Sequence, residues 1–151
     1  MTRYDAEVRT TFTLPHPPET VLAHFASLEV IAAATADVER YQAHEDGRLA
    51  FDFKEQNLGV AKFKGQYTAR YAVEGDTLTW STLTEEPHNS GTEGEATFKA
   101  VAEGTEVSYR EAVFFEVEVP AMVAGMLKPA MVKGLESTVN TYLKKVKGAL
   151  G

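Results

Sequence analysis

The sequence predicts an α+β fold in which a curved antiparallel sheet of six to seven strands wraps around a long C-terminal helix. From Val107 to Val119, apolar and polar side chains alternate, as in a strand with one buried face. From Pro120 to Lys147, apolar residues recur every three or four positions, as on an amphipathic helix. Turn residues divide the preceding segment, residues 38–119, into short runs. Together these patterns predict a sheet that packs one face against the helix.

The first elements are a strand and two short helices. Residues 8–14 alternate between apolar and polar side chains and predict a strand that ends at Pro15. Pro17-Pro18-Glu19 is typical of a helix start, because proline fits the first turn and an acidic side chain suits the positive end of the helix dipole. A second short helix is predicted from Ser27, a capping residue, to Ala34.

Six further strands are separated by turn sequences such as Asp46-Gly47 and Glu74-Gly75-Asp76, which predict an antiparallel meander. Gly65 interrupts the longest early strand and predicts a bulge that curls the sheet. The predicted strands are Val38 to Ala43, Leu49 to Glu55, Val60 to Val73, Thr77 to Thr84, Thr92 to Val101 and Thr105 to Val119.

The C-terminal helix has one irregular segment. Pro129 lacks an amide hydrogen and predicts a kink or a fresh helical start. Gly125 and Gly134 flank it, so the segment between them is a candidate opening to the interior. Lysines near the end suit the negative end of the helix dipole, and Gly148 predicts the stop.

Composition restricts the class of protein. The chain has 151 residues, 44% hydrophobic and 25% charged, with no internal linker, which predicts a single domain over residues 1–151. A net charge of -7 argues against nucleic acid, which requires a basic surface. No apolar run approaches the roughly 20 residues that cross a bilayer, and residues 1–14 do not resemble a signal peptide. We therefore expect a cytoplasmic protein without stable membrane insertion.

Motifs for metal, cofactor or nucleophilic chemistry are not apparent. The four histidines are scattered and have no ligand spacing, so no metal is predicted. The absence of cysteine excludes disulfides, thiolate ligands and cysteine nucleophiles. The sequence has no Gly-x-Ser-x-Gly elbow and no phosphate-binding loop, and no cofactor is predicted.

Glu111 is the most specific candidate residue. It shares the parity of Tyr109 and Val113, so a regular strand directs its carboxylate into the interior. There burial can raise its pKa enough for acid-base chemistry or for a hydrogen bond to a ligand. The alternative is a bulge that turns Glu111 outward, or an ion pair with Arg70 or Arg110. Both interpretations remain open at this point.

Further candidates are residues whose side chains are predicted to face the interior and to offer polar or adaptable contacts. Aromatic and hydroxyl side chains combine apolar surface with a hydrogen-bonding group, and methionine adapts to varied apolar ligands. The same residues also suit an ordinary core. The candidate ligand-binding residues are Tyr67, Tyr71, Trp80, Thr82, Tyr109, Glu111, Met122, Met126 and Met131.

The element order, with Phe12 to Val21, Phe63-Lys64-Gly65, the turn and strand from Gly104 to Tyr109 and the helix from Pro120 to Lys147, resembles the START and birch-pollen-allergen superfamily. This superfamily is also called the polyketide cyclase or SRPBCC superfamily. The resemblance is closest to its carbon monoxide dehydrogenase G-like branch. It implies the helix-grip fold and a pocket between sheet and helix more strongly than it implies a reaction.

We therefore expect a protein that binds or transports a small hydrophobic ligand, such as a lipid, a quinone or a polyketide-like compound, without catalysis. One alternative is a cyclase or hydratase that uses Glu111 and tyrosines as acid-base groups. The other is an accessory protein with a filled interior, which binds a second copy of itself or a client protein through an apolar edge. Phe114, on the otherwise polar parity of its strand, is the specific indication of such an edge.

Overall fold

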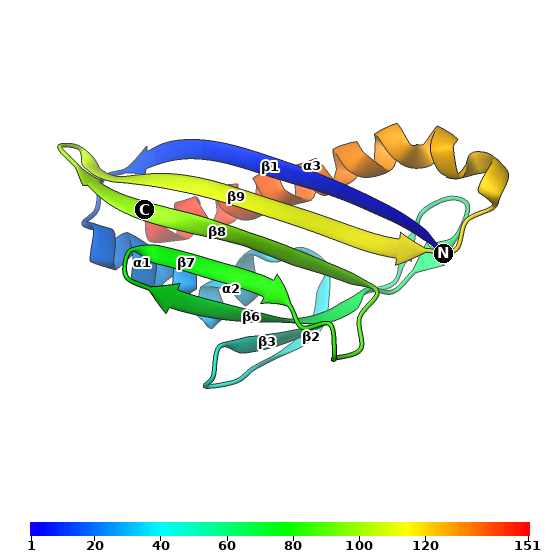
Figure 1. The fold of residues 1–151 in the computed structure, drawn as a ribbon, viewed down its shortest axis with the longest axis horizontal. Helices are drawn as coiled ribbons and strands as arrows, with labels where there is room; N and C mark the ends of the chain where they lie inside the picture. The colour runs from blue at the N-terminus through cyan, green and yellow to red at the C-terminus, as the bar shows by residue number, and fades with distance from the viewer.

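The computed structural model describes residues 1–151 and has the predicted architecture, an antiparallel sheet packed on a long C-terminal helix (Figure 1). The main sheet has seven strands in the order β1-β9-β8-β7-β6-β3-β2. Its strands are β1 (Thr2–Leu14), β2 (Val38–Ala43), β3 (Arg48–Phe53), β6 (Gln66–Glu74), β7 (Thr77–Thr82), β8 (Ser90–Val101) and β9 (Gly104–Val117). The helices are α1 (Pro18–Ala26), α2 (Leu28–Ala34) and α3 (Ala121–Leu150), and a small hairpin comprises β4 (Gln56–Asn57) and β5 (Lys62–Phe63).

The predicted strand from Val60 to Val73 is two strands, because the chain leaves the sheet at Gly65. The Gly65 carbonyl accepts a hydrogen bond of 2.9 Å from the Phe53 amide. The rings of Phe53 and Phe63 pack where a Gly65 side chain would lie, 3.2 and 3.1 Å from an added Cβ. The expected bulge is therefore a complete break. It frees the β4–β5 hairpin to fold over one end of the sheet.

The core lies between the inner face of the sheet and the three helices. Phe25 of α1 packs against Phe98 and Tyr109, with ring centroids 5.5 and 6.5 Å apart. The C-terminal half of α3 completes this cluster with its buried residues Val139, Leu143 and Val146. The helical stripe predicted from sequence is thus the face that covers the sheet.

The N-terminal half of α3 has a different environment. None of its residues is fully buried, and Figure 1 shows its first turns running past the end of the sheet. The helix continues through Pro129 without a new start. No helix in the protein, α3 included, combines the length and apolarity needed to cross a membrane.

The turn before β9 fixes this long strand to the end of β1. Gly104 has φ 137°, a conformation open mainly to glycine, and an added Cβ would collide with the Leu14 carbonyl. The neighbouring Thr105 hydroxyl donates a 2.7 Å hydrogen bond to the His16 carbonyl. From this anchored turn, β9 pairs continuously with β1 on one side and β8 on the other.

Candidate functional site

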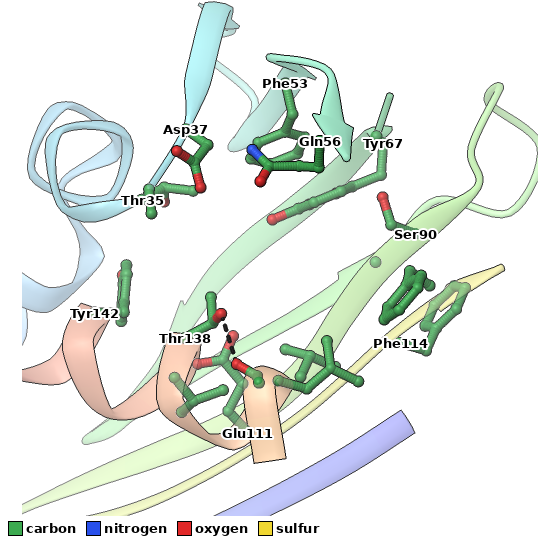
Figure 2. Close-up of a pocket in the computed structure, with 18 of the residues that line it drawn as sticks. Thr35, Asp37, Phe53, Gln56, Tyr67, Ser90, Glu111, Phe114, Thr138 and Tyr142 are labelled. Atoms are coloured by element: carbon green, nitrogen blue, oxygen red, sulfur yellow. Dashed lines mark hydrogen bonds between the residues drawn. The ribbon is translucent and has the colours of Figure 1, made fainter. Parts of the chain in front are cut away.

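A cavity of about 400 Å³ lies between the sheet and α3. It is lined by 28 residues, 18 of them hydrophobic, from α1, the turn after α2, β3, the β4–β5 hairpin, β6 to β9 and α3. Figure 2 shows Gln56, Tyr67 and Glu111, from three different elements, around this space. The volume falls in the lower part of the range of about 300–1,000 Å³ typical of small-molecule sites.

Glu111 points into this cavity, because β9 is regular where a bulge was the alternative. It pairs with Gly94 on β8 and Val8 on β1, with no shift of register. Arg110, the adjacent residue, faces the opposite side and forms hydrogen bonds of 2.7 and 2.9 Å with Glu93. The outward-facing interpretation of Glu111, including its ion pair with Arg110, is therefore wrong.

Both carboxylate oxygens of Glu111 accept hydrogen bonds. The Tyr109 hydroxyl donates to Oε1 at 2.7 Å, and the Thr92 hydroxyl donates to Oε2 at 2.6 Å. Thr92 in turn accepts a 3.1 Å hydrogen bond from the Trp80 indole nitrogen. This chain of donors, from β7 through β8 to β9, holds the carboxylate in one orientation on the cavity floor.

Gly94 makes this arrangement possible. It lies between Trp80 and Glu111 in one row of directly paired residues across the sheet. A Cβ at Gly94 would lie 2.6 Å from Cζ2 of the Trp80 indole. Because Gly94 has no side chain, the indole can lie close to the strand, and its nitrogen reaches the Thr92 hydroxyl. The position that a Gly94 side chain would occupy is thus filled by Trp80.

Three further tyrosines bring hydroxyl groups without protein partners to the cavity. Tyr67 and Tyr71 share the inner face of β6, and Tyr142 projects from α3. Every fully buried polar side-chain atom of the protein has a hydrogen-bond partner, whereas these three hydroxyls have none. Their oxygens therefore face accessible space, where a ligand or water can satisfy them.

Burial dominates the electrostatics of the cavity. It raises the pKa of Glu111 above the ordinary value of 4.5, and the hydrogen bonds from Thr92 and Tyr109 oppose this shift. Burial, reinforced by the nearby Glu111 charge, raises the pKa of all four cavity tyrosines above their ordinary range. The tyrosines thus stay neutral near pH 7. Glu111 is then the interior group that can change charge between acidic and neutral pH.

This electrostatic description predicts the pH dependence of stability. Because the folded pKa of Glu111 is raised, the folded state holds this proton more tightly than the unfolded state. The contribution of protonated Glu111 to folding stability is therefore fully present below the pKa of Glu111 in the unfolded state. It is lost as pH rises through the higher pKa of the folded state. Relative to Glu111→Gln, wild type should lose stability as pH rises above about 4.5, measured by urea unfolding at several pH values.

Glu93→Gln is the matched control, since Glu93 lies on the opposite face. A hydrogen bond from Arg110 lowers the pKa of Glu93, so its contribution is present at neutral pH and is lost on acidification. Wild type should therefore gain stability relative to Glu93→Gln as pH rises. For each variant, the stability difference from wild type is plotted against pH. If the two plots slope in the same direction, the buried position of Glu111 is contradicted.

Most of the predicted site residues line the cavity, and three do not. Thr82 lies outside it, where its hydroxyl bonds the backbone of Thr92 at 2.8 and 3.0 Å. Met122 and Met126 have 93% and 75% of their surface exposed. They lie one turn apart on the free face of α3, where the helix runs past the sheet, so placing them in the site was wrong. The predicted residues that do line the cavity are Tyr67, Tyr71, Trp80, Tyr109, Glu111 and Met131.

Sequence reasoning missed Thr92 and Tyr142. Thr92 shares the parity of Gly94 on β8, but its contact with Glu111 depends on the register between β8 and β9. Tyr142 belongs to the recognised apolar stripe of α3, where its hydroxyl distinguishes it from its neighbours. The sequence did contain one indication of this role, namely the hydroxyl group of Tyr142 within the otherwise apolar stripe of α3.

The mouth of the cavity lies beside the middle of α3. Exposed lining residues Ala130, Gly134 and Thr138 lie one turn apart on this helix. Asp37 and Lys54, also exposed, contribute to the lining from the other side, and the Lys54 amide donates to the Asp37 carbonyl at 2.8 Å. Figure 2 shows Asp37 and Thr138 on opposite sides of the space. The candidate opening between Gly125 and Gly134 thus overlaps the start of this border.

Phe114 does not form a bare apolar edge. Its ring is half-buried, and the Arg3 guanidinium lies 3.8 Å from the ring centroid. His88 packs edge-on against it, with centroids 6.4 Å apart. Binding of a second copy or a client protein through Phe114 stays a prediction.

Solved structures with this fold come from several bacteria. The protein TTHA0849 from Thermus thermophilus is 22% identical, with a TM-score of 0.66 over 95% of this chain and 96% of that one. The Zhui aromatase/cyclase from Streptomyces sp. R1128 is 17% identical, with a TM-score of 0.61 over 97% and 94% of the two chains. The di-domain aromatase/cyclase StfQ of the steffimycin biosynthetic pathway is 11% identical, with a TM-score of 0.59, and the match covers 96% of this chain and 50% of StfQ. These similarities establish the fold.

The sequence itself establishes the family. No curated protein shows significant similarity to the chain. The model of the family described as polyketide cyclase / dehydrase and lipid transport matches residues 5–142, which include all of the sheet except the start of β1, and most of α3. This match confirms the superfamily expected from the strand and helix motifs. The chain therefore belongs to the polyketide cyclase/dehydrase and lipid transport family.

Proposed function

We propose that the protein binds a small, mostly apolar molecule, such as a lipid, a quinone or a polyketide-like compound, in the cavity between sheet and α3. The observation that carries this proposal is the combination of an open apolar cavity with partnerless tyrosine hydroxyls inside it. An apolar ligand gains about 25 cal/mol for each Å² of apolar surface removed from water. The hydroxyls of Tyr67, Tyr71 and Tyr142 then orient its polar groups.

Family membership and fold support this proposal. The family is described by polyketide cyclase, dehydrase and lipid transport activities, and lipids are mostly apolar molecules. Two of the similar structures are aromatase/cyclases by name. The unfilled cavity of about 400 Å³ favours ligand binding over an accessory protein with a filled interior.

Native mass spectrometry and solvent extraction of freshly purified protein test the proposal. We expect an apolar compound to copurify at up to one molecule per chain, and to be released by organic solvent. Apo protein can then be offered a panel of fatty alcohols, quinones and aromatic polyketides. If none of these compounds saturates a single site, the proposal is wrong.

A second candidate function is catalysis by Glu111. The carboxylate is buried, its pKa is raised by that burial, and Tyr109 lies 2.7 Å away, so both an acid-base group and a hydroxyl are present. The compounds that copurify with wild type and with Glu111→Gln distinguish the two functions. The same compound on both proteins supports binding alone. A precursor that accumulates on Glu111→Gln, and that wild type converts, supports catalysis.

A further inference from the structure

The charges around the cavity are unevenly placed. Of the lining residues, three carry a formal charge, namely Asp37, Lys54 and Glu111. Asp37 and Lys54 are exposed at the mouth, whereas Glu111 is the charged group in the interior. The cavity therefore has a carboxyl group at its inner end, and its single cation lies at the opening.

The inner end holds no cation that could compensate a second negative charge. Around Glu111 lie the hydroxyls of Thr92 and Tyr109, and both already donate to its carboxylate. A ligand carboxylate placed there would lose its hydration and would face Glu111 across a medium of low dielectric constant. An uncharged hydroxyl or carbonyl has no such cost. It can accept from Tyr67 or Tyr71, or donate to a free lone pair of Glu111.

We infer that the cavity is directional and selects its ligand by charge: the inner end takes an uncharged polar group, and an anionic group is tolerated at the mouth beside Lys54 alone. This inference rests on the proposed binding function and narrows its ligand to apolar molecules with an uncharged hydroxyl or carbonyl end. Fatty acids and other carboxylates then bind tail first or are rejected. The net charge of -7 acts in the same direction, because it disfavours anions approaching the protein.

Rigid ligands with identical groups at both ends test this inference, because one group must then lie at the inner end. We propose isothermal titration of apo protein with 2,6-dihydroxynaphthalene, naphthalene-2,6-dicarboxamide and naphthalene-2,6-dicarboxylate at pH 7.5. The dicarboxamide matches the dicarboxylate in shape but carries no charge. We expect both neutral compounds to bind at least tenfold more tightly than the dicarboxylate.

Glu111→Gln removes the interior charge and should reduce this preference, because the lost hydration of the ligand carboxylate is then the remaining cost, while Glu93→Gln, on the outer face, should leave it unchanged. If Glu111→Gln does not fold, the wild-type preference for dicarboxamide over dicarboxylate remains decisive. Equal binding of these two compounds to wild type would overturn the inference and leave the proposed function standing. Binding of none of the three, together with failure of the wider panel, would overturn the proposed function and the inference with it.

Discussion

Thr138→Phe should weaken the binding of apolar ligands at least tenfold, a loss of about 1.4 kcal/mol or more in binding free energy. Thr138 is exposed on α3 and borders the mouth, with Gly134 one turn before it. A phenyl ring at this position occupies the passage between α3 and Asp37. Because the side chain is exposed, the substitution should cost little folding stability. Isothermal titration with 1-decanol measures the loss.

Thr141→Phe is the matched control for this substitution. Thr141 is also an exposed threonine of α3, but it does not line the cavity. The Thr141→Phe variant should bind 1-decanol with the same affinity as wild type. Equal weakening by both substitutions would show that a general change in the helix, and not closure of the mouth, reduces binding. Unchanged binding by Thr138→Phe would place the opening elsewhere.

Gly94→Ala should destabilise the protein by about 3 kcal/mol, near the upper end of the range of about 1–3 kcal/mol for overpacked cores. The added methyl group collides with the Arg110 carbonyl and lies 2.6 Å from the Trp80 ring, so the indole has to move. Movement of the indole breaks its hydrogen bond to Thr92 and loosens the support of Glu111. Urea unfolding measures the loss of stability.

Gly134→Ala provides the comparison, because an added Cβ there meets no atom within 4 Å. In a helix this change should stabilise by up to about 1 kcal/mol. Trp80 is the single tryptophan and has 5% of its surface exposed, so its emission reports its own displacement. Gly94→Ala should shift the emission to longer wavelength, and Gly134→Ala should not. An unshifted, fully stable Gly94→Ala would contradict the packing described for Trp80.

The fold was predictable because its patterns are local. Alternation along β9 and the apolar stripe of α3 each follow from the period of one element. Gly65, by contrast, ends a strand at a point where the rings of Phe53 and Phe63 pack closely, and the contact with Phe53 of β3 is not visible within the predicted strand. The strand boundaries therefore depended on tertiary packing.

The site was predictable only in part, for the same reason. The parity of Tyr67 and Tyr71 placed them correctly, because side-chain direction in a strand is a local property. Met131 is five residues from Met126, which rotates it by about 140° around a helix of 3.6 residues per turn. Methionines that are close in sequence therefore lie on different faces, and Met131 alone reaches the cavity.

Glu111 required information from neighbouring strands. Within β9, its parity could not be separated from a bulge, because residues 112–115 break the alternation. The continuous pairing with β1 and β8 removes that ambiguity. A buried carboxyl group needs donors. Tyr109 supplies one from β9 itself, and Thr92 supplies the other from β8, whose register with β9 the sequence does not specify.

Titration of apo protein with 1-decanol, followed by Trp80 emission, tests most directly whether the interior is a ligand-binding cavity. Trp80 lines the cavity, and 1-decanol does not absorb where the indole is excited. We predict a saturable change with one ligand per chain in wild type, and a midpoint at least tenfold higher in Thr138→Phe. A change that is linear and unsaturable, or identical in the two proteins, would contradict a binding cavity between the sheet and α3.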